Sequence, residues 1–109
     1  MNRTFKEVPS FTNKWHALGL TDSDLRTLEM ILLKNPKIGS VITGTGGIRK
    51  IRIPVENTGK RSGGRVLYVD IEIKECIYLL DLYTKNEKID LTKKEQKILK
   101  KLVSILKEE

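Results

Sequence analysis

Basic side chains gather at one place in the sequence where a strand would align them on a single surface. In the stretch IRKIRI, Lys50 and Arg52 alternate with Ile51 and Ile53. Side chains alternate between the two faces of a strand, so the two cations share one face and the isoleucines share the other. Arginine offers a planar fork of donors and lysine a compact point charge, which suit a phosphodiester backbone.

More cations follow in the next part of the chain. The loop VENTGKRSGG is expected to return toward the first strand, and with it come Lys60, Arg61 and Arg65. Residues 44–66 hold six Lys or Arg and one acidic residue, whereas residues 67–91 hold three Lys or Arg and six acidic residues. The formal net charge of +7 is thus concentrated around this surface, which favours an anionic partner. Composition alone leaves open the alternative of a solvated outer face of a half-exposed sheet.

The other residue types narrow the chemistry. Cys76 is the only cysteine, which excludes a disulfide framework within the chain and a multi-cysteine metal site. The glycine run GTGGIRK lacks the spacing of a Walker A loop, and it precedes a strand instead of joining a strand to a helix. The glycine run therefore does not indicate a nucleotide cradle at a helix N-terminus. No segment approaches the roughly 18 apolar residues of a membrane span, so we expect a cytoplasmic protein without membrane contact.

Helices are predicted in the first third of the chain. The segment RTFKEVPSF alternates enough for a short strand or an extended arm ending near Pro9, and FTNKWHALG indicates a short helix closed by Gly19. The next helix is predicted to begin at Thr21, with Asp24 in the capping-box position, and to end near Asn35.

Strands are predicted in the middle of the chain, and a helix at its end. After IRKIRI, the second strand is expected to place four apolar side chains on one face: Leu67, Val69, Ile71 and Ile73. The third strand, CIYLLDLYT, is apolar almost throughout, as in a central strand covered on both sides. A second capping box, Thr92 with Glu95, starts the last helix. The prediction is an α+β fold with a helical pair, an antiparallel sheet of three to four strands and a C-terminal helix, in one domain over residues 1–109.

Several of these motifs together resemble a known family. The succession LGLTDSDL, LLKNPKIG, VITGTGGIRKIRI, KRSGGRVLYV and IYLLDLYTKNEKIDLTKKE is similar to the RelE/ParE toxin superfamily, specifically to the HigB-type branch of RelE-like toxins from bacterial type II toxin-antitoxin pairs. The resemblance covers almost the whole chain. It implies the RelE-like fold, in which a curved antiparallel sheet carries packed helices.

The resemblance also implies an activity. It implies an endoribonuclease that enters the ribosomal A site, cuts mRNA there and inhibits translation. The resemblance also implies that no metal and no organic cofactor take part. The implied reaction is attack of a ribose 2′-hydroxyl on the adjacent phosphate, leaving a 2′,3′-cyclic phosphate and a 5′-hydroxyl. The implied partners are mRNA, the ribosome and a cognate antitoxin that silences the toxin.

Catalytic roles follow where the family pattern matches. The paired cations of the family's first active-site strand fall on Lys50 and Arg52, the arginine that starts the next strand on Arg65, and the cation at the exit of the last strand on Lys85. The expected catalytic residues are Lys50, Arg65 and Lys85. Arg65 would stabilise the charged phosphate, and Lys50 would transfer a proton because neighbouring cations disfavour its charged form. Lys85 would share that role.

RNA contacts are expected from the residues around them. The expected RNA-binding residues are Arg49, Arg52, Lys60, Arg61, Tyr83 and Asn86. Tyr83 or Tyr68 would stack on a base or act as an acid. Asn86 stands where the best-known members of the family carry arginine.

Two alternatives with the same fold remain at this point. The first is a ParE-like gyrase inhibitor without nuclease activity, against which the cations at Lys50 and Arg52 argue. The second is an RNA-binding or ribosome-binding module without catalysis, which the absence of a matching catalytic histidine and the change at Asn86 leave open.

Overall fold

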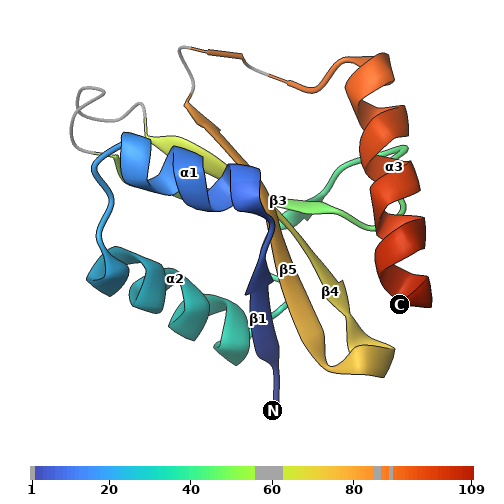
Figure 1. The fold of residues 1–109 in the computed structure, drawn as a ribbon, viewed down its shortest axis with the longest axis horizontal. Coiled ribbons are helices and arrows are strands. Elements are labelled where there is room, and N and C mark those ends of the chain that lie inside the picture. The colour runs from blue at the N-terminus through green and yellow to red at the C-terminus, as the bar shows by residue number, and fades with distance from the viewer. Residues whose placement is uncertain (1, 56–62, 85–86, 89) are drawn as a thin grey trace.

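A computed structural model of the protein describes residues 2–55, 63–84, 87–88 and 90–109. Helices lie on both faces of a central sheet (Figure 1). The strands are β1 (Thr4–Glu7), β2 (Ser40–Val41), β3 (Arg49–Ile53), β4 (Gly64–Ile71) and β5 (Cys76–Thr84). The helices are α1 (Pro9–Ala17), α2 (Asp22–Lys34) and α3 (Lys93–Glu108), with a short 3-10 helix over Glu72–Lys74. None of the described helices is long and apolar enough to cross a membrane.

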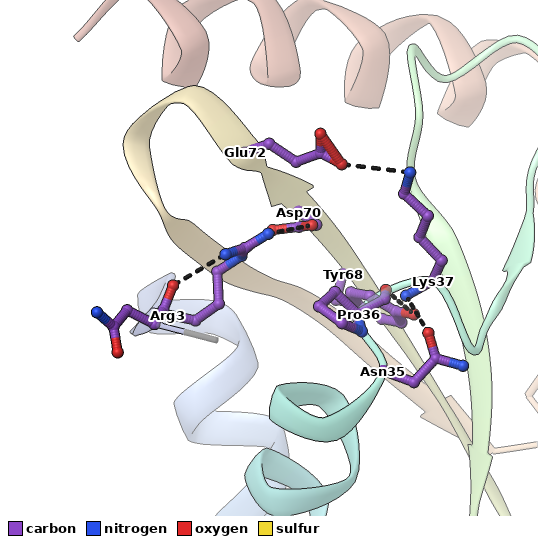
Figure 2. Close-up of polar contacts among 8 residues, drawn as sticks. Arg3, Asn35, Pro36, Lys37, Tyr68, Asp70 and Glu72 are labelled. Carbon is purple, nitrogen blue, oxygen red and sulfur yellow. Dashed lines mark hydrogen bonds and ion pairs between the residues drawn. The ribbon is translucent and has the colours of Figure 1, made fainter.

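The strands form one sheet in the order β1-β5-β4-β3-β2. The antiparallel run from β3 through β4 to β5 is confirmed. The expected sheet of three to four antiparallel strands is too small, because β2 adds an edge of two residues and β1 pairs with β5 in parallel. Arg3 fastens β1 by two contacts with the carboxylate of Asp70 on β4, at 2.7 and 3.2 Å (Figure 2). This long-range ion pair is invisible in the local pattern of the sequence.

Two apolar layers account for the stability of the sheet. On one face, Phe11 and Trp15 of α1 and Leu28 of α2 pack against Val66 and Tyr68 of β4. The other face carries a second buried cluster, which includes Leu67, Val69, Ile71, Tyr78, Val103 and Leu106. Burial of apolar surface on both sides explains the nearly continuous apolar sequence of β5.

Helices α2 and α3 begin where the sequence predicts, whereas α1 begins at Pro9, two residues before the expected segment FTNKWHALG. The Thr21 hydroxyl accepts a hydrogen bond from the Asp24 amide at 3.1 Å, and the Asp24 carboxylate accepts one from the Thr21 amide at 2.8 Å. Thr92 and Glu95 make the same reciprocal pair at the start of α3. The prediction for Ile73 is wrong: the strand stops at Ile71, and the side chain of Ile73 is 90% exposed.

The glycine run forms the turn between β2 and β3. Gly44, Gly46 and Gly47 all have positive φ angles, which other residues rarely adopt. Between them, the buried Thr45 donates to the carbonyl of Ile42 at 2.7 Å and accepts from the amide of Ile48 at 3.2 Å. The turn packs against α3, where a Cβ on Gly44 would lie 3.0 Å from a side-chain oxygen of Gln96. The run is therefore a structural turn.

Candidate active site

A groove of about 630 Å³ opens on the α3 side of the sheet. Its basic side chains are Lys50 and Arg52 from β3 and Arg65 from β4, and its wall includes Gly39 and Ser40. Among the described residues that line it, none belongs to α3. The structure thus brings together three of the cations that the sequence analysis expected on one surface.

Two arginines stand directly opposite each other in this groove. Arg52 and Arg65 are Cα partners in the antiparallel ladder, and both side chains lie on the groove side of the sheet. Like charges directly opposite on neighbouring strands destabilise a sheet. Among the described residues, no carboxylate forms an ion pair with either arginine. Within the described part of the chain the pair thus has no anionic partner, and a phosphate would supply one.

Sequence reasoning missed Asp90, an acidic residue in the same groove. Its Oδ1 atom lies 3.4 Å from Nζ of Lys50, and its side chain is 76% exposed. Asp90 comes from the connection between β5 and α3, and β5 is the neighbour of β4, which carries Arg65. The expected pairing of β5 with β4 is the signal from which the position of Asp90 near the groove could have been predicted. Lys50 consequently has a carboxylate beside it as well as cations, contrary to the expected all-basic surroundings.

Arg49 does not belong to the groove, which corrects its expected RNA contact. It alternates with Lys50 along β3 and lies on the opposite face of the strand. Its guanidinium donates to the carbonyls of Lys37 at 3.1 Å and Gly39 at 2.7 Å. Arg49 therefore fastens the connection between α2 and β2.

Tyr68 also holds the connection between α2 and β2 in place, through two hydrogen bonds of its hydroxyl. Its hydroxyl donates to the carbonyl of Pro36 at 2.8 Å and accepts from the amide of Gly39 at 2.9 Å. Figure 2 shows Tyr68 beside Pro36 at the end of α2. A Cβ on Gly39 would come within 2.8 Å of the Lys50 carbonyl and 2.9 Å of the Tyr68 ring, so glycine is required there. Base stacking or acid catalysis by Tyr68 is therefore wrong, because the ring is fully buried.

We predict that Tyr68→Phe lowers the free energy of unfolding by about 1–3 kcal/mol, because it leaves a buried carbonyl and a buried amide without their partner. Urea unfolding followed by circular dichroism measures the change. Tyr78→Phe is the matched control, since Tyr78 is also buried but its hydroxyl makes no hydrogen bond within the described residues. Equal losses in the two variants would contradict a specific role for the Tyr68 hydroxyl.

Tyr83 is the second tyrosine whose expected role is corrected. It is 1% exposed, so neither face of its ring is open to a base. It pairs with Arg65 in the β4–β5 ladder and forms part of the layer beneath the groove. Its hydroxyl has no hydrogen-bond partner among the described residues. Burial raises the pKa of Tyr83, the charge of Asp90 adds to the rise, and Lys88 and Arg65 oppose it.

A pH effect on stability follows from the two buried tyrosines. Burial also raises the pKa of Tyr68, against a smaller lowering by its bond to Gly39. At high pH the unfolded chain releases the two phenol protons more readily than the folded state does. The contribution of the two phenols to stability is therefore fully present below about pH 10 and is lost as pH rises further. We expect the melting temperature to drop above pH 10, with a smaller drop in Tyr68→Phe than in the parent protein. Parallel curves for the two proteins would contradict this explanation.

Four predicted site residues lie outside the described residues: Lys60, Arg61, Lys85 and Asn86. Their expected roles stay predictions. Within the described ranges, no three His, Cys, Asp or Glu side chains are grouped as they would be around a metal ion. The described residues thus contribute two arginines, one lysine and one carboxylate to the groove.

Comparisons with known proteins identify relatives of this fold. A family model described as the RelE toxin of the RelE/RelB toxin-antitoxin system matches residues 3–109. A mutant of E. coli RelE in the free state has a TM-score of 0.58 at 17% identity, covering 81% of this chain and 88% of that chain. A chain of the intact E. coli RelBE toxin-antitoxin complex gives 0.56 at 17% identity, covering 75% and 94%. The isolated E. coli RelE toxin gives 0.56 at 16% identity, covering 94% and 99%. These structural matches are similar in fold, and they do not distinguish a HigB-type branch.

Proposed function

This chain belongs to the RelE toxin family of RelE/RelB toxin-antitoxin systems, and from that premise we propose that it cleaves mRNA in the ribosomal A site. The observation that carries the proposal is the opposed pair of Arg52 and Arg65 in an open groove. Both guanidiniums keep their charge at any physiological pH, and each offers a fork of donors to phosphate oxygens. An RNA backbone would relieve their mutual repulsion on binding.

Arg65 is proposed to stabilise the reacting phosphate. It is half-buried at the start of β4, so its position is set by the central strands before substrate binds. Preorganised charges of this kind stabilise the extra negative charge that develops on phosphorus in the transition state. Arg52, which is more exposed, is proposed to hold the neighbouring backbone.

Lys50 and Asp90 are proposed to move the protons. Asp90 takes the proton from the ribose 2′-hydroxyl as the 2′ oxygen forms its bond to phosphorus. Lys50 gives a proton to the 5′ oxygen as the bond between that oxygen and phosphorus breaks. The products are a 2′,3′-cyclic phosphate and a 5′-hydroxyl, and the 3.4 Å pair lets the proton return from Asp90 to Lys50.

The ribosome is proposed to supply the geometry that this groove lacks. The groove is open, and Asp90 is 76% exposed, so the described side chains leave a ribose free to adopt many orientations. Holding the 2′-hydroxyl in line with the leaving oxygen accounts for much of the barrier in such a reaction. Messenger RNA fixed in the A site would arrive already ordered.

Primer extension on mRNA from a translating extract tests the proposal. We predict new 5′ ends within the translated frame when the purified protein is added, and none on the same mRNA without ribosomes. Rapid cleavage of the naked mRNA would contradict ribosome dependence. Stalls without new 5′ ends would identify a binding module without catalysis, and inhibition of purified gyrase in a supercoiling assay would identify a ParE-like activity.

A further inference from the structure

The contact between Asp90 and Lys50 does not by itself fix the proposed proton acceptor in the groove. The two charged atoms lie 3.4 Å apart, and the Asp90 side chain is 76% exposed. Exposed ion pairs of this length contribute little to stability and are screened by salt. A proton acceptor works only within hydrogen-bond reach of the proton that it takes. The position of Asp90 therefore depends on contacts made by the chain on either side of it.

The carboxylate of Glu95 contacts the chain on both sides of Asp90. Its Oε1 atom accepts a hydrogen bond from the Thr92 amide at 2.9 Å, and its Oε2 atom accepts one from Nζ of Lys88 at 2.6 Å. Lys88 and Thr92 each lie two residues from Asp90 in the sequence. One side chain at the start of α3 therefore joins the two flanks of Asp90 to each other and to the helix.

The ion pair between Lys88 and Glu95 is short and partly shielded from water. The charged atoms lie 2.6 Å apart, and the side chains are 28% and 37% exposed, against 30% and 76% for the pair in the groove. Hydrogen bonds that involve charged groups are about twice as strong as neutral ones. The bond to Glu95 raises the pKa of Lys88, and the same bond lowers the pKa of Glu95. Both side chains therefore stay charged at neutral pH.

Both flanks of Asp90 are also fastened to the sheet. The Lys88 ammonium lies 5.2 Å from the centroid of the Tyr83 ring, within the range of a cation–π contact. Tyr83 belongs to β5 and is the ladder partner of Arg65 in the groove. On the other flank, Leu91 is buried in the apolar cluster on the α3 side of the sheet. These contacts leave the side chain of Asp90 exposed beside the groove cations.

We propose that Lys88 and Glu95 are positioning residues for the reaction, and that their ion pair holds Asp90 beside Lys50. The inference rests on the proposed function, since it takes Asp90 as the proton acceptor. Neither Lys88 nor Glu95 is among the described residues that line the groove, so neither is expected to touch the RNA. Loss of the ion pair frees the Lys88 flank, and the carboxylate then meets the ribose 2′-hydroxyl less often. The reaction slows while the binding of substrate is kept.

Steady-state cleavage of ribosome-bound mRNA by the full-length protein separates these two effects. Lys88→Met is expected to lower kcat about tenfold or more and to leave KM within about twofold of the parent value, because a misplaced group costs rate and not affinity. Lys88→Arg keeps the charge and the donors and should retain most of the rate. The matched control is Lys97→Met, since Lys97 is an exposed lysine of α3 that does not line the groove. A rise in KM at unchanged kcat would overturn the inference, because Lys88 would then bind RNA.

Glu95→Gln separates the ion pair from the helix cap. The amide oxygen of glutamine still accepts from the Thr92 amide, but the side chain carries no charge for Lys88. We expect the same loss of kcat as in Lys88→Met, and no further loss when the two substitutions are combined, because both remove one interaction. Independent losses that multiply in the double variant would overturn the inference.

The backbone order parameter of Asp90, measured by nitrogen-15 relaxation, tests the inference without RNA or ribosomes. It is expected to fall from about 0.85 to below about 0.6 in Lys88→Met and in Glu95→Gln, and to stay at the parent value in Lys97→Met. An unchanged order parameter in the first two variants would overturn the inference. A lower order parameter with cleavage at the parent rate would support the positioning of Asp90 by the ion pair and contradict the proposed function of Asp90 alone.

Discussion

Replacing Arg65 by alanine is expected to lower mRNA cleavage in translating extracts on the order of 10²-fold or more, as removal of one preorganised donor does in other enzymes. Arg65 faces Arg52 across the ladder and forms no ion pair with a described carboxylate, so its loss breaks no stabilising contact of that kind. The free energy of unfolding should stay equal or rise, because the repulsion between the two guanidiniums disappears.

Arg26→Ala is the matched control for this variant. Arg26 is an exposed arginine on α2, away from the groove, and its removal changes the net charge by the same amount. The ratio of the two cleavage rates therefore measures the effect of the position of the lost charge, because the change in net charge is the same in both variants. Arg65→Lys should recover only part of the rate, because an ammonium keeps the charge and loses the planar fork. Cleavage by Arg65→Ala at the rate of the Arg26→Ala protein would remove Arg65 from the site.

Features that depend on short stretches of chain could be predicted from the sequence. The cap made by Thr21 and Asp24 spans four residues, and the shared face of Lys50 and Arg52 spans three. Both follow from the regular local geometry of a single helix or strand. Arg65 also lies opposite the β3 cations as expected, because strands that follow one another in the sequence are usually neighbours in a sheet.

Features that depend on contacts between distant segments could not be predicted in this way. The parallel pairing of β1 with β5 is accompanied by an ion pair between Arg3 and Asp70, which are far apart in the sequence. Asp90 follows the stretch TKNEKI, which gives no local sign that Asp90 lies beside Lys50. Tyr83 is an aromatic residue of the kind that stacks on bases. Only the packing of the folded protein shows that its ring is buried.

Replacing Asp90 by asparagine is expected to lower the cleavage rate of ribosome-bound mRNA by about 10²–10⁴-fold, the usual contribution of a positioned proton acceptor. The amide has nearly the same shape as the carboxylate but accepts no proton at neutral pH. The substitution also removes the one described negative charge that lines the groove. Binding of a short RNA to the purified protein should therefore become tighter, while cleavage becomes slower.

Opposite changes in binding and cleavage are the distinctive outcome for Asp90. If this carboxylate only held Lys50 through the 3.4 Å ion pair, its loss would free a cation for RNA, and binding and cleavage would improve together. Glu108→Gln is the control, because Glu108 is an exposed acidic residue near the end of α3 and its loss changes the net charge equally. Cleavage by Asp90→Asn at or above the rate of Glu108→Gln would show that the proton is accepted elsewhere, and Asp90 would then be a competitor of the RNA phosphate for Lys50.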